Sequence, residues 1–149
     1  TLVSNIIGEG HQDKVFSLVK RVLKLSFCIV SAMVILFCIF PEAVARIYTD
    51  IPDLVIASGP ALIVMCSSYF FQVPGMIFFQ AVSGTGSTKT AFRLELVALA
   101  AYMIYCTLVI GIFKADIAIC WTAEHIYASS MMVLCYTYLK SGRWKNRKI

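Results

Sequence analysis

Four long apolar stretches, separated by short polar segments, dominate the chain and cover residues of about 22–40, 54–82, 94–113 and 117–139. At about 1.5 Å of rise per residue, helices of these lengths span about 28 to 43 Å, and a bilayer core is about 30 Å thick. Strands are excluded because backbone groups in lipid must be bonded within a helix or a closed barrel, and the runs are too long for barrel strands. The pattern therefore predicts an all-α, polytopic membrane bundle of four full transmembrane helices.

The beginning of the chain follows a different pattern. Residue 1 is Thr rather than Met, and the apolar run at 2–7 is too short to cross a bilayer. We therefore expect this run to be the end of a preceding helix and residues 1–149 to be a piece of a longer protein. The chain is then part of one membrane lobe, with a basic tail at 140–149.

The second apolar stretch is longer than one membrane crossing requires, and it contains Pro60, Pro74 and Gly75. A proline inside a helix removes one backbone hydrogen bond and crowds the preceding turn. We therefore expect a helix kink at Pro74 and Gly75.

Composition agrees with a membrane location. Hydrophobic residues make up 60% of the chain, charged residues 14%, and the mean hydropathy is +0.83. Soluble domains contain about a quarter charged residues, and disordered chains are far less apolar.

All six cysteines lie in apolar segments without CxxC spacing. The sequence therefore predicts no disulfide, no metal site and no cofactor.

The basic residues predict the topology. The net charge is +5, but the bases gather at the ends of the apolar runs, which favours lipid headgroups over nucleic acid as the partner. When alternate connections are assigned to opposite sides, eleven bases fall on one side and only Arg46 and Lys114 on the other. The positive-inside rule then places both chain ends in the cytoplasm, with the four spans in the inner (plasma) membrane.

Charged residues inside a span are costly and are therefore candidates for function. Glu124 lies about seven residues into the last stretch, beside His125. One interpretation makes Glu124 a carrier of a proton or cation, with His125 as a partner. The alternative is that Glu124 reaches the interface or bonds a neighbouring helix near Trp121. Glu95, one turn into the third stretch, is expected to form an interfacial ion pair with Arg93 or Lys89.

The second stretch carries polar and aromatic candidates. Gln72 and Gln80 bracket Pro74 and are spaced to share one helix face. They could hydrogen-bond a substrate or join neighbouring helices. Tyr69 belongs to an aromatic group that could line a cavity for flat organic cations or pack against lipid and other helices.

The segment SGTGSTKT at 83–90 resembles a phosphate-binding loop only superficially, because Thr rather than Gly precedes Lys89 and a membrane helix leads into it. It is interpreted as a cytoplasmic turn, in which Gly84 and Gly86 supply positive φ and a Ser or Thr caps the next helix. No catalytic triad, paired carboxylates or zinc-protease motif is present, so an enzyme is not predicted.

Several motifs occur in a characteristic order: SNIIGEG at 4–10, IYTD at 47–50, QAVSGTGSTK at 80–89, Trp121, and YLKSGRW at 138–144. Together they resemble the multidrug and toxic compound extrusion (MATE) family over nearly the whole chain. The resemblance implies a twelve-helix protein of two lobes that exports organic cations in exchange for H⁺ or Na⁺. This chain would be the end of the C-terminal lobe, packed against the remaining helices of the transporter.

The family's coupling carboxylates lie largely on helices that precede this segment, or at a position of the second span where this chain has no acid. The ion site therefore rests on Glu124, with Gln72, Gln80 and Tyr69 as substrate-binding candidates.

Two alternative functions stay open. A lipid-linked glycan flippase of the same wider superfamily would be expected to carry basic residues inside its spans, and a membrane scaffold subunit would have no transport path.

Overall fold

The computed structural model describes residues 2–145, and every regular element in this range is helical. In chain order the elements are α1 (Leu2–Gly8), the short 3-10 turn η1 (Gln12–Lys14), α2 (Val15–Ile39), α3 (Pro41–Arg46), α4 (Pro52–Gly84), α5 (Thr88–Cys106), the π-helical segment η2 (Thr107–Ile112), α6 (Ile117–Cys120) and α7 (Ala123–Lys140). Four helical stretches, Gln12–Ile39, Pro52–Gly84, Thr88–Ile112 and Ile117–Lys140, are long and apolar enough to cross a membrane. The predicted all-α class with four membrane spans is confirmed.

The first span begins earlier than its apolar run. It was expected from about residue 22, whereas α2 begins at Val15 and includes Lys20, Arg21 and Lys24. All three basic side chains are exposed. Long basic side chains can extend their charged ends to the membrane surface, so a helix can continue beyond the segment that hydropathy alone identifies.

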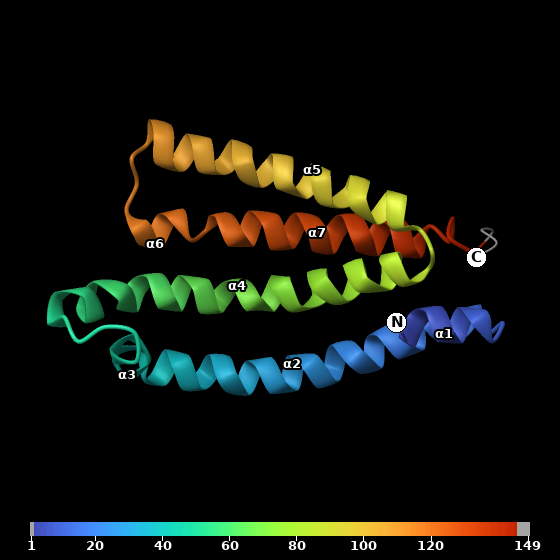
Figure 1. Cartoon of the computed structure of the whole chain (residues 1–149), viewed down its shortest axis with the longest axis horizontal. Helices are drawn as coiled ribbons and strands as arrows, with labels where there is room; N and C mark the ends of the chain where they lie inside the picture. Colours follow the sequence, from blue (N-terminus) through green and yellow to red (C-terminus); the bar gives the residue numbers. More distant parts are fainter. Residues whose placement is uncertain (1, 146–149) are drawn as a thin grey trace.

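The four long helices lie side by side in a single layer, in the order α5, α7, α4, α2 (Figure 1). The packing agrees with this order, because α7 contacts both α4 and α5, and α2 contacts α4. The short helix α1 packs against α2 and α4. A single layer has two faces, and a side chain that points out of it can meet a ligand or another segment without displacing a neighbouring helix.

The two ends of this layer differ. At one end the starts of α2 and α5 meet the ends of α4 and α7, and this end carries Lys14, Lys89, Arg93, Lys140 and Lys145; we call it the basic end. The buried apolar core is concentrated there and is built from Val3, Ile7, Val15, Val19, Ala81, Val82, Ala91, Ala98, Met131, Cys135, Leu139 and Trp144. At the opposite end, around α3 and the turn after η2, large apolar side chains such as Tyr48 and Phe113 are exposed.

The α4–α7 contact depends on a glycine. Pro74 and Gly75 are both buried, and a Cβ atom added to Gly75 would lie 3.0 Å from the carbonyl oxygen of Ala128. Glycine therefore favours this close approach, because a larger residue would require the two helix backbones to move apart by a few tenths of an ångström. α4 continues as one helix through Pro60 and Pro74, and the kink expected at Pro74 and Gly75 stays a prediction.

The turn between α4 and α5 partly follows the prediction. Gly86 has the expected positive φ of 76°, whereas Gly84 is the last residue of α4 and is not in that conformation. The expected side-chain cap on α5 is wrong. Ser87 occupies the capping position but makes no side-chain cap bond, and its hydroxyl instead accepts a hydrogen bond from the Tyr138 hydroxyl at 3.0 Å.

Candidate ion- and substrate-binding site

The three predicted residues on α4 share one side of that helix. At about 100° per residue, Tyr69, Gln72 and Gln80 fall within a sector of about 80°. Gly75, which faces α7, lies about 60° outside this sector, so the sector is directed away from α7. Tyr69 and Gln72 are half-buried and Gln80 is exposed. Because α4 is one continuous helix here, Gln72 and Gln80 lie near one face as their spacing predicted, and Tyr69 lies on the same side.

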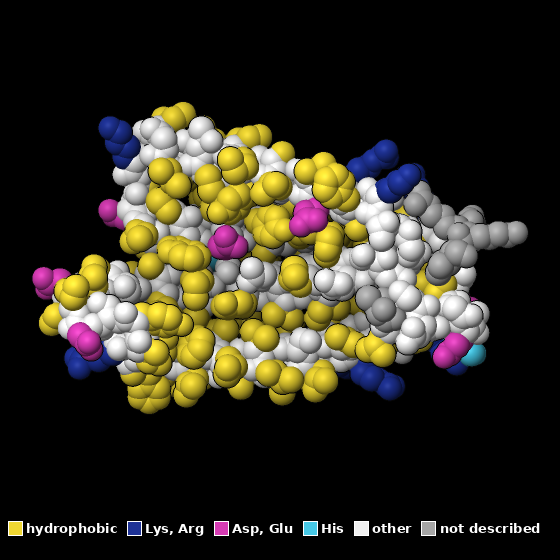
Figure 2. Space-filling view, viewed as in Figure 1, with side chains coloured by type: hydrophobic (Ala, Val, Ile, Leu, Met, Phe, Trp, Pro, Cys, Tyr) yellow, Lys and Arg dark blue, Asp and Glu magenta, His cyan; other side chains and the backbone are white. Residues whose placement is uncertain are grey.

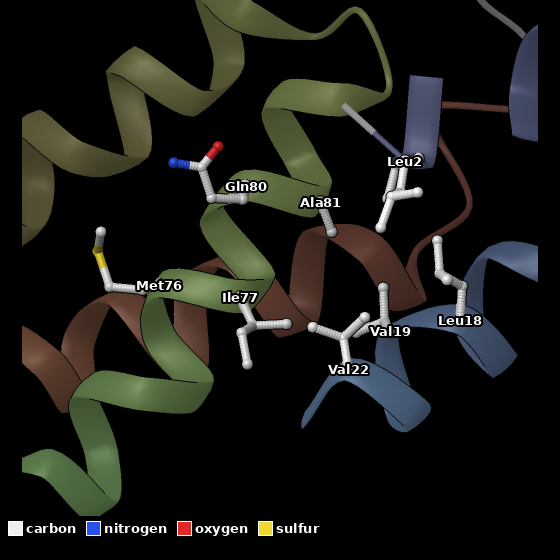
Figure 3. A pocket seen from close by; sticks show the side chains of 9 residues that line it. Leu2, Leu18, Val19, Val22, Met76, Ile77, Gln80 and Ala81 are labelled. Carbon is white, nitrogen blue, oxygen red and sulfur yellow. The ribbon is translucent and has the colours of Figure 1, made fainter. Parts of the chain in front are cut away.

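Gln80 also lines an apolar groove between α1, α2 and α4, with a volume of about 270 Å³ (Figure 3). The other lining residues are Leu2, Val3, Leu18, Val19, Val22, Met76, Ile77 and Ala81. Gln80 is the one polar side chain in this lining, and Figure 3 shows its amide projecting away from Ile77 and Val22. An apolar cleft with few polar groups is the usual form of a small-molecule site.

Glu124 lies near two tyrosines at the α5–α7 contact. It is half-buried in the first turn of α7, where the helix dipole favours a negative charge. Its carboxylate interacts electrostatically with the phenol groups of Tyr102 on α5 and Tyr127 on α7. The two rings meet edge to face, with their centroids 6.1 Å apart. The acid therefore has phenolic hydroxyls as neighbours within the span.

The backbone is irregular on both helices near Glu124. α5 continues as the π-helical segment η2, and the last span is interrupted at Trp121 and Thr122 between α6 and α7. The Tyr105 hydroxyl, near the end of α5, and the Thr122 hydroxyl are 2.6 Å apart and link α5 to the interruption before α7. Local π-helical segments inside longer helices are frequent at functional sites.

The expected ion pair of Glu95 is wrong. The ion pairs between described side chains do not include Glu95, which is half-buried and interacts instead with the Tyr127 phenol. Arg93 lies two residues from Glu95, and residues at this spacing do not face each other on a helix. Figure 2 shows acidic side chains set within the hydrophobic surface over α5 and α7, and the acids on these helices are Glu95 and Glu124.

The expected pairing of His125 with Glu124 is also wrong. The His125 Nε2 atom lies 2.8 Å from the Ser67 hydroxyl on α4, and the imidazole ring packs against Phe71. Its other ring nitrogen, Nδ1, is buried without a hydrogen-bond partner among the described residues. Adjacent residues on a helix point about 100° apart, so Glu124 does not share the direction in which His125 meets α4.

The predicted residues thus form two groups rather than one. Within residues 2–145, no hydrogen bond or ion pair joins Glu124 to Gln72, Gln80 or Tyr69. In the same range, no group of three His, Cys, Asp or Glu side chains is placed to hold a metal ion.

Sequence analysis missed Tyr127, although its position three residues after Glu124 predicts contact on a helix. It also missed Ser67 and Tyr102, which only the packing of α4 and α5 against α7 identifies.

Comparisons with known proteins give one family and one relative. The MatE family model matches residues 1–108. A relative from Thermotoga maritima, described as "Probable multidrug resistance protein NorM", is 23% identical over 154 residues, which cover 100% of this chain and 32% of the relative. The chain thus spans about a third of that relative's length. No solved structure gives a significant match.

Proposed function

Because the chain belongs to the MATE family, we propose that it forms the C-terminal part of a cation-coupled multidrug efflux antiporter. In this proposal, binding of H⁺ or Na⁺ on one side drives the release of organic cations on the other, through alternating access. The observation that carries the proposal is the polar side of α4, where Tyr69, Gln72 and Gln80 share one sector next to an apolar groove. The remaining helices of the same transporter would complete the cavity.

The proposed substrate surface suits a partly apolar organic cation. The groove offers apolar side chains from three helices, and Gln80 adds a hydrogen-bonding group at its edge. Tyr69 lies farther along the same side of α4 and can present its aromatic face to a cation. Such a surface binds by area and by a few polar contacts, which is typical of sites that accept many substrates.

The proposed coupling residue is Glu124. It is one of two acids in the last two spans, the other being Glu95, and the interruption at Trp121–Thr122 directly precedes its helix. Ionisable residues at such depth usually mark ion or proton pathways. Protonation of Glu124 would remove its charge beside Tyr102 and Tyr127, and this change could be transmitted to the packing of α5 on α7.

The proposed orientation places the basic end in the cytoplasm of a cell whose plasma membrane holds the protein. The support is the uneven distribution of bases, because Lys14, Lys89, Arg93, Lys140 and Lys145 lie at this end. Only Arg46 and Lys114 lie at the opposite end. Positively charged loops are retained on the cytoplasmic side during membrane insertion.

Transport by the reconstituted full-length protein tests the proposal. Proteoliposomes loaded with a fluorescent organic cation would be given a proton gradient, a sodium gradient or no gradient. Gradient-dependent dye movement is expected with one of the two ions and not without a gradient. Dye movement that is the same under all three conditions would rule out the antiporter. Movement of a labelled lipid-linked sugar without dye transport would favour the flippase, although no Lys or Arg lies in the middle of a span.

A further inference from the structure

The end of the chain folds back onto the bundle at the basic end. After α7, Gly142 adopts a positive φ of 67° and reverses the chain direction. Trp144 is then buried, with only 2% of its surface exposed, and its indole N–H donates a hydrogen bond to the Leu139 carbonyl at 2.9 Å. A segment expected to be a basic tail therefore begins as a packed turn; residues 146–149 lie outside the described range.

Trp144 joins helices that are far apart in the sequence. It belongs to the same buried cluster as Ile7 of α1, Val15 of α2, Val82 of α4 and Leu139 of α7. Large aromatic side chains bury the most apolar area per residue, so Trp144 contributes strongly to this core. The core thus depends on a residue that follows the last helix.

Three polar contacts reinforce the same region. The Ser4 hydroxyl donates to the Gly84 carbonyl at 3.0 Å, and the Tyr138 hydroxyl donates to the Ser87 hydroxyl at 3.0 Å. Lys145 forms an ion pair with Asp13 at 3.1 Å across the two ends of the chain. This pair is exposed and screened by water, so it is weak, and the buried indole is the stronger connection.

The opposite end has no comparable connection among the described residues. The buried cluster does not extend to α3 or to the turn after η2, where Ile47, Tyr48 and Phe113 are 79%, 86% and 72% exposed. Local stability follows the density of buried contacts. Buried contacts between the helices are therefore denser at the basic end than at the other.

We propose that the segment Gly142–Lys145 packs onto the basic ends of α1, α2, α4 and α7 and holds them together as one unit. Relative movement of these helices is then confined to the opposite end, including the part of α4 that precedes Pro74. This proposal concerns the chain's internal mechanics and does not depend on what the protein transports.

Hydrogen exchange of the full-length protein in lipid nanodiscs tests whether the segment Gly142–Lys145 holds these helices together. Trp144→Ala removes the indole and should accelerate exchange in α1 and at residues 15–19 by about a hundredfold or more, because the local cluster opens. Exchange at residues 60–70 of α4 should stay unchanged. Trp121→Ala is the matched control, since Trp121 lies at the opposite end and is 38% exposed; it should leave α1 exchange unaltered.

A milder variant keeps the test decisive if Trp144→Ala does not fold. Trp144→Phe retains an aromatic ring but loses the N–H donor to Leu139, and should accelerate exchange in α1 by about three- to tenfold. Unchanged exchange in α1 in the folded variants would overturn the proposal. So would an equal acceleration in α1 and at residues 60–70, because it would show general destabilisation rather than a local connection.

Discussion

His125 and Ser67 connect α7 to α4 through a contact of 2.8 Å between the imidazole Nε2 and the serine hydroxyl. Because the other ring nitrogen is buried without a partner, this contact is the imidazole's single hydrogen bond among the described residues. It lies on the same helix pair as the close approach of Gly75 to Ala128. These two contacts fix how α4 and α7 are positioned relative to each other, and each gives a direct test.

Ser67→Ala should destabilise the folded protein by about 1 to 3 kcal/mol, because both ring nitrogens of His125 would then lack partners. Thermal unfolding in detergent measures the effect. Ser58→Ala is the control, since the Ser58 hydroxyl bonds only the Leu54 carbonyl of its own helix, and its effect should stay within about 0.5 kcal/mol. Equal unfolding temperatures for the two variants would contradict a structural role for the Ser67–His125 contact.

Gly75→Ala should destabilise the protein by about 1 to 3 kcal/mol, because the new methyl group would meet the Ala128 carbonyl oxygen at 3.0 Å and push α4 from α7. Gly59→Ala adds the same methyl group to the same helix with nothing within 4 Å. It should be neutral or slightly stabilising, because alanine favours the helix. The comparison is measured by thermal unfolding, and a stable Gly75→Ala protein would show that the helices separate easily.

Glu124→Gln should abolish ion-coupled efflux of organic cations while leaving the amount of protein in the membrane unchanged. The amide keeps the shape of the side chain but cannot bind and release a proton or hold a cation by charge. Efflux from cells and membrane abundance are measured together. Glu95→Gln is the matched control, because Glu95 is also half-buried and also interacts with Tyr127. Efflux at the wild-type rate in Glu124→Gln would remove this residue from the proposed ion site.

Pro74→Ala should slow transport more than it lowers stability, if a bend at Pro74 takes part in the movement of α4. Alanine restores the missing backbone hydrogen bond and stiffens the helix. Turnover in proteoliposomes and the unfolding temperature give the two measurements. Pro60→Ala changes an exposed proline in the same helix and should leave turnover unaffected. Wild-type turnover in Pro74→Ala would leave Pro74 with a packing role only.

The reading frame upstream of Thr1 should encode about eight further hydrophobic spans, as expected for a transporter built from two lobes. Sequencing this region is a direct check that needs no protein. The matched relative supports the expectation, since this chain covers 32% of its length. A start codon only a few dozen residues upstream would contradict the two-lobe transporter and favour the scaffold subunit.

Sequence analysis predicted the spans and the shared side of α4, because both depend on local regularities. Hydropathy identifies segments that must lie in lipid, and the fixed rotation per residue places Gln72 and Gln80 near one face of the helix. It failed at Glu95 and Ser87 for related reasons. Glu95 was paired by nearness in sequence, and a Ser or Thr of the turn was expected to cap α5, whereas Glu95 interacts with Tyr127 and Ser87, at the capping position, bonds Tyr138.

The sequence by itself determined that the chain forms four membrane helices, since the cost of placing unpaired backbone groups in lipid leaves no other arrangement for such long apolar runs. It also determined the polar side of α4. Only the tertiary structure decided that His125 meets Ser67, that Tyr138 bonds Ser87, and that Trp144 is buried in the core. These relationships join residues that are distant in the chain, and they depend on which helices pack together and on their relative rotation, which no local pattern specifies.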